Sequence, residues 1–98
     1  MDRRRTIESL TRSMPELRAR FGVTRLALFG SMVRDTATPG GDVDVLVAFD
    51  GPATSARYFG VQFLLEDLLG RPVDLVTDRA LRPELRPAIE RERVDVRG

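Results

Sequence analysis

The chain has 98 residues, enough for one domain over residues 1–98, and its hydrophobic content of 42% allows one compact core. Its formal net charge is +1, so no global field draws it to nucleic acid or a membrane surface, and direct nucleic-acid binding is not expected. Cysteine is absent, which excludes disulfides, thiolate zinc sites and a thiol nucleophile. All 16 basic residues are arginine, so there is no lysine for Schiff-base chemistry. Histidine, the usual acid–base group of neutral pH, is absent too.

The first predicted element is an amphipathic helix over residues 4–21. Its apolar side chains recur at helical spacing, at Ile7, Leu10, Met14, Leu17 and Phe21. Pro15 lies inside this stretch, and we expect it to kink or divide the helix. Gly22 follows as a fitting helix stop.

A first strand is predicted over residues 23–29. Its buried side chains are expected to be Leu26, Leu28 and Ala27. Gly30 and Ser31 form the turn that leaves this strand, and residues 31–35 are predicted as a short helix. Residues 36–41 contain a proline and two glycines and are predicted as a loop.

The second strand is predicted over residues 43–49, which are apolar on both faces beyond Asp44. Such a run is expected of a central strand. A helix then begins at a cap at residues 54–55 and runs to about Leu69, with Gly70 as its stop.

The last third of the chain begins with a third strand over residues 73–77. A final helix is predicted over residues 81–92, with Leu85 and Ile89 as its buried pair. Residues 94–96 then form a short terminal strand or fray.

The predicted order of elements is αβαβαβα, which indicates an α/β fold with helices packed on a small sheet. Three aromatic side chains stand in the predicted helix before Gly70. We expect them to belong to the core rather than to a platform for adenine: Tyr58, Phe59 and Phe63.

Three aspartates occupy the starts of two predicted strands. Side chains two residues apart on a strand point to the same face, so Asp42 and Asp44 present two carboxylates side by side. If the second and third strands pair, Asp74 joins them at one sheet edge. Carboxylates this close repel one another unless a cation lies between them. The expected cations are divalent and held by oxygen, which favours Mg²⁺ or Mn²⁺, and three carboxylates argue for two of them.

The turn after the first strand is a candidate site for the phosphates that such metals carry. Gly30 lets a phosphate approach the backbone without a Cβ in the way. Ser31 at a helix N-terminus offers a hydroxyl and amides, and Arg34 one turn later could reach the same triphosphate. Asp74 is placed to act as general base or as a ligand of the second metal.

Gly30-Ser31, ten further residues and then Asp42-x-Asp44 resemble the signature of the DNA polymerase β-like nucleotidyltransferase superfamily. The stretches FGSMVRDTATPGGDVDVLVAF and LLEDLLGRPVDLVT, with Asp74 in the second, are similar to the minimal nucleotidyltransferases, the MntA-type antitoxins encoded beside HEPN-domain toxins. The resemblance covers nearly the whole chain. It implies the polymerase β-like fold, an α/β (α+β) arrangement with a small mixed sheet of three to four strands.

The resemblance also implies a function. Such an antitoxin is a magnesium-dependent protein adenylyltransferase that transfers AMP from ATP to a tyrosine of a HEPN ribonuclease, with which it would form a hetero-oligomer. The family's phosphate-binding pair corresponds to Gly30 and Ser31, its metal ligands to Asp42 and Asp44, and its third acidic residue to Asp74.

Two positions depart from the pattern of many relatives. Asp35 stands where many have glycine, and Gly41 where many have serine before the first aspartate. Neither departure removes a ligand. Asp35 adds a negative charge near the expected triphosphate, which would weaken ATP binding if the side chain points inward.

Two other functions stay open at this point. One is a binding module, an antitoxin that neutralises its toxin by occlusion without catalysis. The other is a nucleotidyltransferase acting on a small molecule or an RNA end, for which a second subunit would have to supply the acceptor pocket. No apolar run approaches transmembrane length and the N-terminus lacks a signal-peptide apolar region, so a cytoplasmic protein without membrane contact is expected.

Overall fold

Four strands form one mixed sheet in the order β3-β2-β1-β4. The computed structural model describes residues 3–30, 33 and 41–97. The sheet is antiparallel between β1 and both β2 and β4, and parallel between β2 and β3. The elements in chain order are α1 (Arg3–Phe21), β1 (Val23–Phe29), β2 (Val43–Phe49), α2 (Ser55–Leu69), β3 (Val73–Thr77), the 3₁₀ turn η2 (Asp78–Ala80), α3 (Arg86–Glu92) and β4 (Val94–Asp95).

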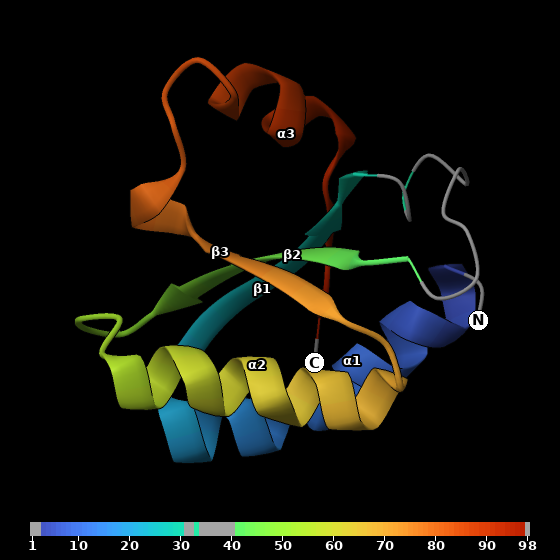
Figure 1. The fold of residues 1–98 in the computed structure, drawn as a ribbon, viewed down its shortest axis with the longest axis vertical. Coiled ribbons are helices and arrows are strands. Elements are labelled where there is room, and N and C mark those ends of the chain that lie inside the picture. Colours follow the sequence, from blue (N-terminus) through green and yellow to red (C-terminus); the bar gives the residue numbers. More distant parts are fainter. Residues whose placement is uncertain (1–2, 31–32, 34–40, 98) are drawn as a thin grey trace.

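The helices cover the two faces of the sheet unequally. Figure 1 shows α1 and α2 side by side against one face and the short α3 over the other. The larger apolar cluster joins α1 and α2 to the side chains of β1, β2 and β3 that point to them. A smaller cluster on the α3 side contains Ala27, Leu46, Leu81 and Ile89. Apolar side chains therefore cover less of the α3 face, and polar side chains can lie there.

The predicted strands and two of the predicted helix stops are confirmed. β2 lies between β1 and β3, as its apolar faces indicated. Gly22 and Gly70 both have positive φ, +69° and +65°, and end α1 and α2. The Thr54 side chain caps α2 by accepting a hydrogen bond of 3.2 Å from the backbone N–H of Arg57. Val94 belongs to a terminal strand that pairs with β1.

Of the two expected effects of Pro15, a kink or a division of the first helix, the division is wrong, because α1 continues through Pro15. Pro15 is exposed, while Leu10, Met14 and Leu17 on the opposite side of the helix are fully buried. A proline removes one helical hydrogen bond. On the solvent side water can satisfy the carbonyl group that loses its partner, so packing of the apolar side holds the helix together.

The last helix begins five residues later than predicted, at Arg86 rather than Leu81. Pro83 disfavours helical backbone at the residue before it, and Pro87 is placed in the first turn of α3, where no N–H is needed. Leu85 precedes the helix and is 49% exposed, so it does not form the predicted buried pair with Ile89. Ile89 itself is buried.

The short helix predicted over residues 31–35 lies outside the described residues except for Val33. Val33 lies in a turn, and its N–H donates a hydrogen bond of 3.1 Å to the carbonyl of Gly30. In the part of the chain that the structure describes, no helix is both long and apolar enough to cross a bilayer.

The expectation that the aromatic side chains of α2 belong to the core holds for Tyr58, which packs against the large cluster, and is wrong for Phe59 and Phe63. Phe59 is 48% exposed and Phe63 is 63% exposed. Tyr58 is half-buried, and its hydroxyl donates a hydrogen bond to the carbonyl of Leu75. The apolar residues of α2 surround the helix, so only some of them can face the sheet.

Two substitutions on α2 separate the core face from the exposed face. We expect Leu65→Ala to lower the free energy of unfolding by about 3 kcal/mol, since Leu65 is fully buried and its truncation leaves a cavity. We expect Phe63→Ala to change it by about 0.5 kcal/mol or less, because that ring is mostly exposed. Urea unfolding of the two variants measures both values, and an equal loss for the two would contradict this arrangement of α2.

Candidate active site

Asp44 and Asp74 are opposite each other on adjacent parallel strands. The register pairs Asp44 of β2 with Asp74 of β3. Val43, Val45 and Val73 point into the large cluster under α1 and α2, so the alternating aspartates lie on the opposite face of the sheet, toward α3. The prediction that these two strands pair and that these two carboxylates share a face is confirmed.

Asp42 lies two residues before Asp44, just ahead of β2, and is exposed. The pairing with β3 extends to this end of the strand, because the N–H of Val43 donates a hydrogen bond of 2.9 Å to the carbonyl of Pro72. Arg71 also holds the chain here, since its Nε donates to the carbonyl of Gly41 at 3.1 Å. All three aspartates therefore belong to the same end of β2 and β3.

Gly30 ends β1 directly beside Asp44. The register pairs Phe29 with Asp44, and Gly30 has φ +75°. A Cβ added at Gly30 would overlap the carboxylate of Asp44. Glycine is therefore required here for two reasons. Its φ is positive, and the carboxylate occupies the space that a Cβ would need. From the sequence we expected a Cβ here to obstruct a phosphate, and in the structure it would also overlap the carboxylate of Asp44.

The backbone N–H of Gly30 donates a hydrogen bond of 3.1 Å to Oε1 of Glu92 at the end of α3. No motif in the sequence marks Glu92 for this contact. The two residues are 62 positions apart, and no local pattern connects them. Ser31 and Arg34, the other two predicted phosphate-binding residues, lie outside the described residues, and their roles stay predictions.

The described residues hold no group of three or more Asp, Glu, His or Cys side chains close enough to bind a metal ion by themselves. Mg²⁺ is usually bound through one or two carboxylates together with substrate phosphates and water, not in an all-protein cage. Asp42 and Asp44, with oxygen donors alone and a glycine beside them, fit a site of that kind.

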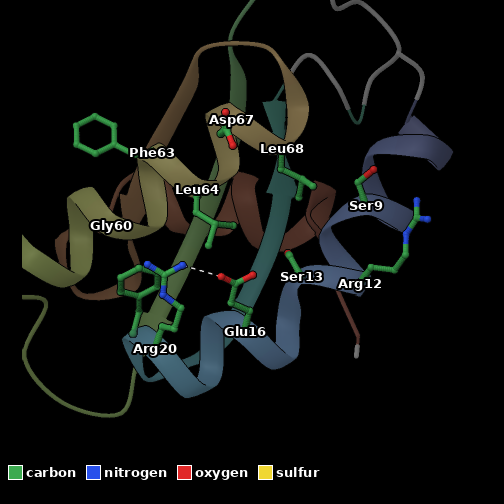
Figure 2. A pocket seen from close by; sticks show the side chains of 11 residues that line it. Ser9, Arg12, Ser13, Glu16, Arg20, Gly60, Phe63, Leu64, Asp67 and Leu68 are labelled. Carbon is green, nitrogen blue, oxygen red and sulfur yellow. Dashed lines mark hydrogen bonds and ion pairs between the residues drawn. The ribbon is translucent and has the colours of Figure 1, made fainter.

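Two hollows lie elsewhere on the described surface. The larger has a volume of about 1090 Å³ and runs between α1 and α2 (Figure 2). Ser9, Arg12 and Glu16 line it from α1, and Leu64 and Leu68 from α2, on the sheet face opposite the aspartates. The smaller, about 230 Å³, lies at the far ends of β2 and β3, where it is lined by residues such as Phe49 and Thr77. Neither contains Asp42, Asp44 or Asp74.

Comparison with known proteins agrees with this geometry. Residues 10–96 match the nucleotidyltransferase domain family. Over 91 residues the chain is 42% identical to the protein adenylyltransferase MntA of Thermococcus cleftensis, and this match covers 92% of each chain. Among solved structures, one assigned to a minimal nucleotidyltransferase superposes with a TM-score of 0.79 at 37% identity, covering 96% of this chain and 95% of that one.

A more distant structure has the same fold. It contains a tri-AMPylated HEPN toxin of Shewanella oneidensis in complex with an MNT antitoxin, and superposes with a TM-score of 0.70 at 17% identity over 98% of this chain and 72% of that one. One assignment follows from the mixed sheet, from the aspartates at one end of β2 and β3, and from these relatives. The chain belongs to the nucleotidyltransferase domain family and, within it, to the minimal nucleotidyltransferases related to MntA.

Proposed function

We propose that this protein is an antitoxin that transfers AMP from ATP to a tyrosine of a HEPN-type ribonuclease. The observation that carries the proposal is the pairing of Asp44 with Asp74 on the face of the sheet where Gly30 ends β1. The relative from Thermococcus cleftensis is a protein adenylyltransferase, which supports a protein as the acceptor. The toxin complexed with an MNT antitoxin in the distant structure carries AMP groups, which supports the class of partner.

The reaction forms a bond between the tyrosine oxygen and the α-phosphorus of ATP and breaks the bond from that phosphorus to the β-phosphate oxygen. Pyrophosphate leaves, and the hydroxyl proton passes to Asp74 or to solvent. Asp42 and Asp44 would hold Mg²⁺, or Mn²⁺ in its place, and Asp74 is a candidate ligand for a second ion. Bound there, the ions would neutralise the triphosphate and lower the pKa of the attacking hydroxyl.

The remaining surface supports a protein partner. Phe59 and Phe63 of α2 are 48% and 63% exposed, and their rings stack with centroids 6.1 Å apart. Exposed apolar side chains that lie together are typical of surfaces that partners cover. This observation also suits a second candidate function, in which the protein neutralises its toxin by binding alone.

The test is incubation of the protein with labelled ATP, Mg²⁺ and the product of the adjacent gene, followed by mass spectrometry. We expect AMP on a tyrosine of that product, and no label when EDTA removes the metal. Titration with Mg·ATP then separates the two functions. Neutralisation of the toxin without any binding of ATP would refute the transferase and support the binding module.

Asp74→Asn tests the third carboxylate. We expect the turnover number for AMP transfer to fall roughly 100-fold, as for loss of a general base, and the Kd for Mg·ATP to change less than about threefold. Asp74 is exposed, so the free energy of unfolding should shift by about 0.5 kcal/mol or less. Single-turnover labelling with the partner measures the rate, and calorimetry measures Kd. An unchanged turnover number would remove Asp74 from the mechanism.

A further inference from the structure

The contact between Glu92 and Gly30 joins the last helix to the candidate nucleotide site. Oε1 of Glu92 accepts a hydrogen bond of 3.1 Å from the Gly30 N–H in a half-buried position. A hydrogen bond to a charged acceptor is stronger than one between neutral groups. It is made to the backbone, so it holds the chain itself rather than a side chain.

Glu92 is held in place from both directions along the chain. Three residues before it, Ile89 is buried in the cluster with Ala27 and Leu46 of the sheet. Two residues after it, Val94 pairs with Leu28 of β1. With an anchor on each side, the end of α3 has little freedom, and the carboxylate is presented to the end of β1.

Gly30 therefore lies between two acidic side chains from different elements. The Glu92 carboxylate binds its N–H, while the Asp44 carboxylate occupies the space where a Cβ would be. Since the N–H already has a charged acceptor, a phosphate could take this donor only by displacing Glu92. The contact thus fixes how the backbone of Gly30 lies against the Asp44 carboxylate.

We propose that Glu92 is a positioning residue of the nucleotide site, which acts through the Gly30 backbone to hold the turn against Asp44. This inference rests on the proposed function, because it concerns the binding of Mg·ATP at that turn. A turn that is already positioned loses less freedom when the nucleotide binds. Without Glu92 the same contacts to Mg·ATP would form at a larger entropic cost.

Three variants test the role. Glu92→Ala removes the acceptor, Glu92→Gln keeps an acceptor oxygen in the same place, and Glu84→Ala removes an exposed carboxylate from the segment before α3. We expect Glu92→Ala to raise the KM for ATP about tenfold with kcat within about twofold, the pattern of lost uniform binding. We expect Glu92→Gln to recover most of that loss and Glu84→Ala to match the parent protein.

A second measurement is independent of catalysis. The ¹H chemical shift of the Gly30 amide should lie downfield in the parent protein, move upfield in Glu92→Ala and stay near the parent value in Glu92→Gln. A merely structural role would lower kcat through loss of folded protein and leave KM unchanged, and that outcome overturns the proposal. So does a Gly30 amide signal that is the same in all variants. Failure of the parent protein to bind Mg·ATP would instead count against the proposed function, and the amide signal would still report the contact.

Discussion

Asp44→Asn is expected to reduce AMP transfer about 1000-fold or more, because in the proposed function this carboxylate holds a catalytic metal, and such a ligand supplies several kcal/mol of transition-state stabilisation. Asparagine has nearly the same shape as aspartate but carries no charge. The strand should therefore keep its register with β3, and the protein should still bind its partner. The rate is measured by labelled ATP with saturating partner, and the fold by urea unfolding.

The matched control for this variant is Asp67→Asn. Asp67 is exposed on α2, on the other face of the sheet, and lines the hollow between α1 and α2. The same change of charge there should leave the transfer rate within about twofold of the parent, as is usual for a surface substitution. If both variants lost activity equally, the effect would be one of net charge. If Asp44→Asn kept its rate, Asp44 would have no part in holding a metal.

The candidate site could be predicted to the extent that it depends on local periodicity. Alternation along a strand places Asp44 and Asp74 opposite the buried valines, and the pairing of two apolar runs brings the two aspartates together. The two ends of α2 were also predictable, because Thr54 and Gly70 act on backbone groups only a few residues away.

What the sequence did not indicate depends on contacts between distant parts of the chain. Nothing near Glu92 marks it as a partner of Gly30, which lies on another element. The exposure of Phe63 likewise depends on how α2 is rotated against the sheet, and a helix that is apolar on all sides does not specify that rotation. Helix α1 shows the converse, because buried side chains hold it together past Pro15, although the local rule allowed a division there.

Two glycines allow a direct test of whether activity depends on the position of the Asp44 carboxylate. Gly30 and Gly22 both have positive φ, +75° and +69°, and a Cβ on either would run into an aspartate. For Gly30 that aspartate is Asp44. For Gly22 it is Asp50, whose Oδ1 would lie 2.6 Å from the added Cβ at the far end of β2.

Alanine at either position should lower the free energy of unfolding by about 1–2 kcal/mol, the cost of left-handed backbone for a residue with a Cβ. The effects on catalysis should then differ. Gly22→Ala displaces a carboxylate that plays no part in the proposed reaction, so its transfer rate should stay within about twofold of the parent. Gly30→Ala pushes Asp44 away from Asp42 and Asp74, and a misplacement of about 1 Å at a reacting centre is enough to lower the rate roughly 100-fold.

Urea unfolding measures the stability and labelled ATP the transfer rate on the same samples. Equal transfer rates would show that activity does not depend on the position of Asp44, and the proposed metal site would have to be abandoned. Similar stabilities with unequal rates are the expected result, because the two variants share the left-handed backbone and displace different carboxylates.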